Sequence, residues 1–179
     1  MYERGVLIMY GNSGVCRVED VAPMKGSRGA VDSVCRGAEK NRLYYKLSPV
    51  YGSGTIYVPV DTKIFMRPVL SRREAMDLIR RIPEISDDCG EDVSDWHALS
   101  AIYQEQLHSH DCTDLVHLIK SVYLKNRTNA ENGRRPYKVD QEYQKRAEEL
   151  LHSELAAALD IPMEQVAGFI AAELEKSAL

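Results

Sequence analysis

The sequence lacks any long apolar run, and this absence limits where the protein can act. No stretch approaches the roughly 20 apolar residues that a membrane-spanning helix needs, so no membrane partner is expected. The N-terminal MYERGVLIMYG carries an acid and only five consecutive apolar residues, too few for a signal peptide. With 44% apolar and 28% charged residues, the composition is that of a soluble globular protein, and we expect a cytoplasmic location.

Cysteine pairs and catalytic motifs are also missing. The four cysteines form no C-x-x-C pair, so we expect reduced thiols. There is no glycine-rich phosphate loop, no G-x-S-x-G and no H-E-x-x-H sequence. We therefore expect a protein that is not an enzyme and that uses no cofactor.

One cluster has the residue types of a metal site. It consists of His108, His110, Asp111, Cys112 and His117. Its spacing matches no structural zinc pattern, and Asp111 also suits the N-cap of a helix. The alternative is a solvated helix junction, and no metal is predicted.

Charge divides the chain into two parts. Residues 1–70 carry 10 Lys and Arg against 6 Asp and Glu, whereas residues 71–179 carry 13 against 21. Within the acidic part, residues 120–146 hold eight basic and three acidic residues, a local charge of +5. We predict two domains, 1–70 and 71–179. The segregated charge indicates something about binding partners and not about the fold.

The first 70 residues have the alternation and the β-branched and aromatic content of strands. The turn sequences GNSG and YGSG are short enough to join neighbouring strands as hairpins. The predicted strands are Val6–Tyr10, Val15–Val21, Tyr44–Val50, Thr55–Val60 and Ile64–Val69. Five short antiparallel strands predict a small closed or half-closed barrel, with residues 22–41 as a long loop.

From Ser71 onward the apolar period becomes that of helices. Ser71 and Glu74 have the spacing of a capping box, and Pro83 should end the first helix near Ile82. This change marks the predicted domain boundary.

Four further helices follow. The second is predicted to begin near Ser94 or Asp95, the third after Asp111, the fourth after a break at residues 126–136, and the fifth at Asp160. Each has a single apolar stripe, so the helices need one another and predict a bundle. The predicted fold class is α+β, a β-barrel followed by an all-α domain.

Two features of the second domain suit nucleic acid. Trp96, the only tryptophan, stands at the start of the second predicted helix, either as a core residue on its apolar stripe or as a flat wedge for a base step. The basic segment offers phosphate contacts, or else complements the dipole of its own helix. Its cations are Lys120, Lys125, Arg127, Arg134, Arg135 and Lys138.

The first domain offers an edge strand. Proline is not tolerated within a sheet, so Val58-Pro59 indicates that the fourth strand lies at an edge. An exposed edge can add a strand from a partner, with selectivity from alternate side chains, either Ile56 and Val58 or Thr55 and Tyr57. The alternative is an edge protected by the proline and the neighbouring loop.

These pieces, in this order, resemble the CarD family of bacterial transcription regulators, whose N-terminal module is shared with the transcription-repair coupling factor. The resemblance is carried by residues 6–10 followed by GNSGVCRVEDV, and by Trp96 eleven residues before Leu107 of LHSHD. Further matching segments are RLYYKLSPV, TIYVPVD, MRPVLSRREAMDLI and QKRAEELLHSELAAAL. The similarity extends over nearly the whole chain, and its specificity lies in the collinear order of the segments.

The resemblance implies a Tudor-like, SH3-like barrel that binds the RNA polymerase β subunit by strand addition, and a helical domain that touches promoter DNA. It maps the polymerase contact onto Thr55, Ile56, Tyr57 and Val58. It places Trp96 as a minor-groove wedge at the upstream edge of the transcription bubble, where it would modulate open-complex stability. The chain is expected to act as a monomer.

Several positions depart from the family pattern. Tyr57 and Met24 stand where some members carry arginine, so packing replaces a charge-assisted polymerase contact. Residues 98–101 are Ala-Leu-Ser-Ala, where some members have basic residues, so DNA binding should be weak. The alternative function is a protein-interaction module that binds polymerase or another partner without touching DNA.

Overall fold

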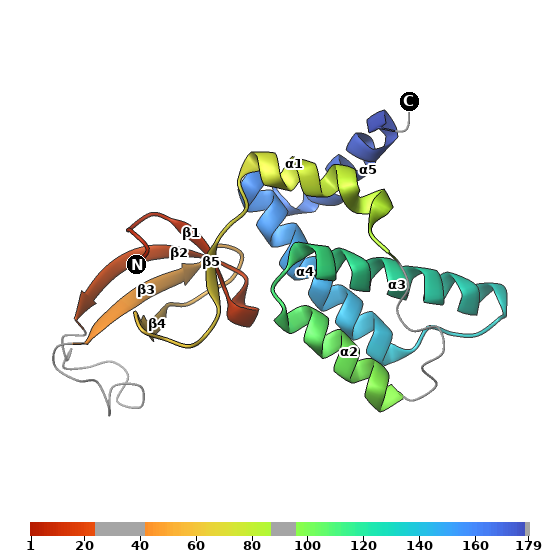
Figure 1. Ribbon diagram of the computed structural model, residues 1–179, viewed down its shortest axis with the longest axis horizontal. Coiled ribbons are helices and arrows are strands. Elements are labelled where there is room, and N and C mark those ends of the chain that lie inside the picture. Colours follow the sequence, from red (N-terminus) through yellow and green to blue (C-terminus); the bar gives the residue numbers. More distant parts are fainter. Residues whose placement is uncertain (24–41, 87–95, 178–179) are drawn as a thin grey trace. The chain divides into compact units, whose positions relative to one another are not determined.

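The computed structural model describes residues 1–23, 42–86 and 96–177, and the chain divides into two compact units. The first unit spans Met1–Val69 and the second Leu70–Leu179. The first is a β-sheet and the second is helical, which confirms the α+β class (Figure 1).

The first unit is a five-stranded antiparallel sheet in the order β4-β3-β2-β1-β5. Each strand begins and ends within two residues of its prediction. Their bounds are β1 (Leu7–Tyr10), β2 (Val15–Pro23), β3 (Leu43–Pro49), β4 (Ile56–Pro59) and β5 (Met66–Pro68). Residues 22 and 23, predicted as part of the long loop, belong to β2, and the rest of that loop lies outside the described residues.

The sheet is not closed into the predicted barrel. β4 and β5 are its two edges, and no ladder joins them among the described residues. Both strands are short and end in proline, which lacks the amide donor that a further pairing would need. Tyr2 links β3 to β5 instead, because its backbone N donates to the Tyr45 hydroxyl (2.9 Å) and its own hydroxyl donates to the Met66 carbonyl (3.0 Å).

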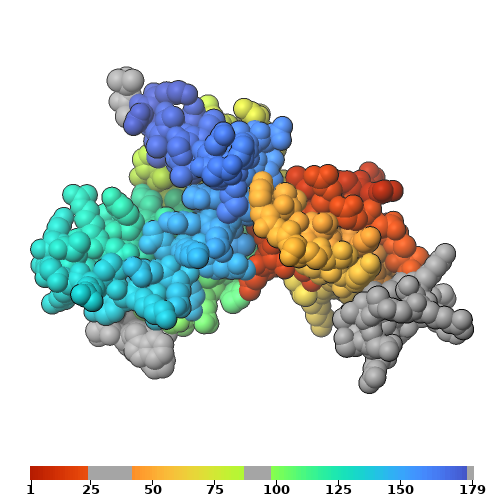
Figure 2. Space-filling model, turned by 180° about the vertical axis from the view of Figure 1, so that it is seen from behind, coloured from red at the N-terminus to blue at the C-terminus, as the bar shows by residue number. Residues whose placement is uncertain are grey.

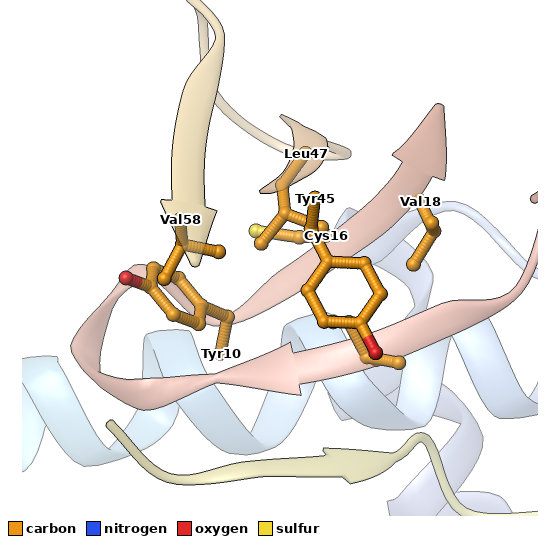
Figure 3. Close-up of a cluster of buried hydrophobic side chains, with 7 residues drawn as sticks. Tyr10, Cys16, Val18, Tyr45, Leu47 and Val58 are labelled. Carbon is orange, nitrogen blue, oxygen red and sulfur yellow. The ribbon is translucent and has the colours of Figure 1, made fainter. Parts of the chain in front are cut away.

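One face of this sheet carries the core of the first unit (Figure 3). Because side chains alternate along a strand, residues two apart point to the same face. Cys16 and Val18 of β2, Tyr45 and Leu47 of β3, and Val58 of β4 are all at most 3% exposed and pack together. The core of the unit is therefore mainly apolar, and the hydroxyl of the buried Tyr45 accepts from Tyr2 N.

The described part of the second unit contains five α-helices. They are α1 (Arg72–Arg81), α2 (Trp96–His108), α3 (Cys112–Glu131), α4 (Lys138–Leu159) and α5 (Val166–Ser177), with short 3₁₀ turns η2 (Ile82–Glu84) and η3 (Met163–Gln165). α4 is the longest and contacts each of the other four. Its apolar stripe, including Leu150, Leu151 and Leu155, is buried against them.

The helix caps predicted at Ser71 and Asp111 are present, whereas the predicted start of the second helix near Ser94 or Asp95 lies outside the described residues. Ser71 Oγ accepts from Glu74 N (3.2 Å), and Ser71 N donates to Glu74 Oε2 (2.7 Å), which completes the capping box of α1. Asp111 Oδ1 accepts from Thr113 N (2.7 Å) at the start of α3. These contacts satisfy amide groups that a helix N-terminus leaves unpaired.

The prediction that the third helix breaks at Asn126 is wrong, because α3 continues to Glu131. The helix ends at Gly133, where Gly133 N bonds Ala130 O (3.0 Å) and Arg134 N bonds Asn129 O (2.7 Å). This paired arrangement is a Schellman motif, and it requires the left-handed backbone that Gly133 adopts with φ +67°.

The fifth helix does not begin at Asp160 as predicted. Asp160 is the C-cap of α4 with a left-handed φ of 57°, and its backbone N donates to Ala156 O. Aspartate tolerates this conformation better than most residues, so it ends a helix here, and α5 starts only at Val166. No single described helix is long and apolar enough to cross a membrane; α4 and Met163–Lys176 reach that limit only together, bent by 104°.

Candidate functional site

One of the two edges of the sheet lies along β4, and no described strand pairs with its outer side; we call it the free β4 edge. Its partner on one side is β3, with Tyr45 opposite Val58 and Lys46 opposite Tyr57. Val60 N donates to Leu43 O (3.0 Å), which fixes the phase of this ladder. Because hydrogen-bonded pairs alternate in an antiparallel ladder, the backbone N–H and C=O of Tyr57 point away from β3.

Pro59 is compatible with this phase. It lies two residues from Tyr57, so its nitrogen also faces away from β3, and the missing N–H costs the ladder nothing. Pro59 O accepts from Thr62 N (3.0 Å) in the following turn. Pro59 therefore offers no outward N–H to a further strand. The outward N–H and C=O of Tyr57 are the backbone groups that a partner strand could bond.

The side chains of β4 divide between the two faces of the sheet. Val58 is 3% exposed and belongs to the core, and Ile56 packs against the same core. Tyr57 is 45% exposed, and Thr55 is exposed just before the strand. The register therefore makes Thr55 and Tyr57 the accessible side chains, and the predicted contact through the Val58 side chain is blocked by its burial.

An ion pair holds the far end of this edge. Arg42, next to the start of β3, lies 2.8 Å from the carboxylate of Asp61, just beyond β4. Hydrogen bonding from Arg42 lowers the pKa of Asp61. The pair joins the two chain segments that leave the β3–β4 ladder, at the end opposite to Thr55.

The side chains of two predicted site residues, Met24 and Trp96, lie outside the described part of the structure. Met24 lies outside the described residues. Trp96 is the first residue of α2, but only its backbone is described. Leu99, Tyr103 and Leu107 of the same predicted stripe are buried, at most 9% exposed.

The structure gives Lys120 an internal role. Its Nζ donates to the backbone carbonyls of Ile82 (3.1 Å) and Ile85, at the turn that follows α1. These carbonyls belong to a helix end, where acceptors lack intrahelical partners. Lys120 therefore joins α3 to the end of α1 and does not project freely toward solvent.

Lys125 is also engaged. Its Nζ lies 2.8 Å from Oδ2 of Asp140, a residue of α4 that is 1% exposed. Tyr103 of α2 donates its hydroxyl to the other carboxylate oxygen of Asp140 at 3.4 Å. A buried carboxylate needs such partners, so this cluster ties α2, α3 and α4 together.

The remaining four cations lie at the surface around the α3–α4 turn. Arg127 pairs with Glu131 (3.3 Å) on α3, and Lys138 lies 3.8 Å from Glu142 on α4. Arg134 and Arg135 are exposed, and no described acidic side chain pairs with them. The structure thus separates the six predicted cations into two with internal contacts, two loosely paired ones, and two without an acidic partner among the described residues.

The cluster considered for a metal has other contacts. Asp111 caps α3, Cys112 Sγ donates to Glu154 Oε2 (3.0 Å), and His117 Nδ1 shares a hydrogen bond with Gln106 Nε2 (2.7 Å). Within the described ranges, no three or more His, Cys, Asp or Glu residues are grouped so that they could hold a metal ion.

Glu154 is a buried acid that the sequence interpretation missed. It is 0% exposed, and besides Cys112 it accepts from Leu70 N (3.1 Å) through Oε1. The sequence does indicate this burial, because Glu154 stands three residues after Leu151 and therefore lies on the apolar stripe of α4. It fixes the first residue of the helical unit to α4.

Comparison with known proteins identifies the first unit. Residues 2–70 match the model of the CarD-like/TRCF RID domain. No curated protein matches the chain. The match covers the sheet, including the free β4 edge. The match to the CarD-like/TRCF RID domain over residues 2–70 indicates that the first unit is an RNA polymerase-interacting module.

Proposed function

We propose that this chain is a non-enzymatic, cytoplasmic transcription regulator that binds the RNA polymerase β subunit and contacts promoter DNA. In this proposal, the sheet is the Tudor-like anchor on polymerase. The helical unit acts at the upstream edge of the transcription bubble, where it modulates the stability of the open complex. The protein acts as a monomer and without a cofactor.

The free β4 edge in a polymerase-interacting domain carries this proposal. Its outward backbone groups at Tyr57 can extend the sheet by one strand of the partner, and main-chain hydrogen bonds supply affinity in such complexes. Thr55 and Tyr57 are exposed on one face and provide side-chain selectivity. Tyr57 carries no charge, so its contribution is packing and hydrogen bonding.

The test of the anchor is the affinity of the full chain for purified RNA polymerase. Tyr57→Glu places a charge on the proposed contact and should weaken binding at least tenfold. The matched control is Ile64→Glu, which introduces the same charge at a 50% exposed apolar residue outside β4 and should bind normally. Equal loss in both variants, or in neither, would reject β4 as the contact.

The proposed DNA contact rests on Trp96 and the exposed arginines. The family resemblance and the position of Trp96 at the first residue of α2 support a wedge role. An inserted aromatic ring unstacks a base step, and closing the bubble would require its removal. Arg134 and Arg135 carry unpaired charge that suits DNA phosphates.

The lifetime of open complexes tests this second part. Saturating protein should lengthen the lifetime on a ribosomal RNA promoter. Trp96→Ala should abolish that effect while polymerase affinity stays unchanged. A variant that still prolongs the lifetime would refute the wedge.

One observation favours an interaction module without DNA contact. Lys120 and Lys125 are bonded within the helical unit, which reduces the number of cations available to phosphates. An unchanged open-complex lifetime, with polymerase binding confirmed in the same sample, would establish this alternative in place of the DNA-contacting regulator.

A further inference from the structure

An exposed tyrosine stands among the cations of the α3–α4 turn. Tyr137 is the N-cap residue of α4 and is 56% exposed, although it is a large, largely apolar side chain. Its side chain makes no capping hydrogen bond. The ring is thus displayed at the surface without a structural role in starting the helix.

A lysine lies over the Tyr137 ring. Lys125 Nζ lies 5.2 Å from the ring centroid, a cation–π arrangement, and Lys125 is itself fixed by the buried Asp140. Although the ammonium lies over the ring, Tyr137 is 56% exposed, so more than half of the residue remains accessible to solvent. The structure thus presents a flat aromatic surface that is already oriented.

The surroundings of this ring are positive. Residues 123–138 contain five Lys and Arg and one acid, Glu131, which pairs with Arg127. Asp140 is neutralised by Lys125, and Glu142 lies beside Lys138. Arg134 and Arg135, directly before Pro136 and Tyr137, are exposed and have no acidic partner among the described residues. Figure 2 shows the chain around residue 130, coloured teal, at the surface of the helical unit.

An exposed aromatic ring that follows two exposed arginines in the same turn fits one class of ligand. Single-stranded nucleic acid offers bases that stack on aromatic rings and phosphates that bind cations, and both features occur in single-strand binding surfaces. A duplex would use the cations but keep its bases stacked inside. An acidic peptide would use the cations without needing a free ring face.

We propose that Tyr137, Arg134 and Arg135 form a binding surface for single-stranded DNA, with a base stacked on Tyr137 and the phosphates held by the arginines. The identity of the strand, the melted promoter DNA, rests on the proposed function. The surface itself follows from the α3–α4 turn alone and does not require Trp96.

The test uses the full chain without polymerase and a fluorescein-labelled dT12 oligonucleotide, followed by anisotropy at low salt. Tyr137→Ala should weaken binding at least fivefold, the fold-change that corresponds to the lower limit of about 1 kcal/mol for one stacked base. Tyr137→Phe keeps the ring and should bind within twofold of the unmodified chain. Arg134→Ala with Arg135→Ala should reduce the slope of log K against log salt by about 1.4.

Tyr123 provides the matched control. It is 60% exposed and stands two residues before Lys125 on α3, so it points to nearly the opposite side of the helix. Tyr123→Ala should bind dT12 as the unmodified chain does. Circular dichroism and thermal unfolding of each variant separate lost binding from lost folding.

Four results would overturn the proposal: no binding of dT12, unchanged binding by Tyr137→Ala, equal losses in the Tyr137 and Tyr123 variants, or a duplex that binds as tightly and with the same dependence on Tyr137. Binding of an acidic peptide such as poly-glutamate with that dependence, in place of dT12, would also overturn it. These failures are distinguishable from a failure of the proposed function, because polymerase affinity and open-complex lifetime are measured separately.

Discussion

Lys125 Nζ lies 2.8 Å from Asp140 Oδ2, and this contact joins the C-terminal half of α3 to the first turn of α4. The side chain of Asp140 is 2% exposed, whereas that of Lys125 is 34% exposed. The carboxylate therefore depends on the lysine, while the lysine keeps partial access to water. The same lysine supports Tyr137, so one ion pair connects the packing of the unit to its exposed turn.

Removal of that lysine should destabilise the helical unit. Lys125→Met leaves a buried carboxylate without its cation, and such losses cost about 3–5 kcal/mol when both partners are buried. Because Lys125 is partly solvated, we expect about 2–3 kcal/mol in urea unfolding.

The double variant Lys125→Met with Asp140→Leu removes both charges and should recover part of this loss, since paired removal leaves no unpaired charge. Additive losses in the two single variants and the double variant would contradict the coupling between the two residues.

Lys120 should behave as a structural residue. Lys120→Met removes a charged donor from the carbonyls of Ile82 and Ile85, and hydrogen bonds to charged groups contribute about 1.5–3 kcal/mol. We expect a loss in the free energy of unfolding of about 1–2 kcal/mol, because Lys120 is not fully buried. The control Lys138→Met affects a side chain that is 87% exposed and should change stability by less than about 0.5 kcal/mol.

Unfolding and DNA binding of Lys120→Met together distinguish a structural role of Lys120 from a phosphate contact. If Lys120→Met unfolds like the unmodified chain but binds DNA less well, the lysine is a phosphate contact and its internal bonds are unimportant.

The Cys16 thiol makes stability depend on pH. Burial raises its pKa from 9.0 to about 11, and its side chain is 0% exposed in the sheet core. Between these pH values the unfolded chain loses the proton while the folded chain keeps it, so stability falls as pH rises. The part due to Cys16 should be roughly 1 kcal/mol between pH 8 and pH 10.

The measurement is urea unfolding of the unmodified chain and of Cys16→Ala at both pH values. The alanine variant should lose less stability over this interval, because it lacks the titrating thiol. A constant difference between the two proteins from pH 8 to pH 10 would show that the thiol titrates alike in both states.

Local signals in the sequence were sufficient for most elements. The period-two pattern located the strands, and the capping residues Ser71 and Asp111 located two helix starts, because these features act within a few residues. Val58-Pro59 correctly indicated an edge strand, since proline restricts pairing wherever it stands in a sheet.

Contacts between distant residues were the part that the sequence could not supply. Closure of the sheet depends on whether β4 pairs with β5. Whether a basic residue is exposed or engaged internally depends on distant partners, Ile82 for Lys120 and Asp140 for Lys125. The end of α3 was a different case. Gly133 indicates the end of α3 in the sequence itself. The polar residues from Asn126 onward do not interrupt the helix, because their helix propensity is only modestly unfavourable.

The affinity of the full chain for RNA polymerase, measured for Tyr57→Ala and Tyr57→Pro, tests the central claim most directly. Both variants lose the tyrosine side chain, but only proline removes the N–H that points outward from β4, and it leaves the β3 ladder intact. Strand addition predicts that Tyr57→Pro binds at least tenfold more weakly than Tyr57→Ala, with both proteins folded. Equal affinities for the two variants would contradict strand addition at β4.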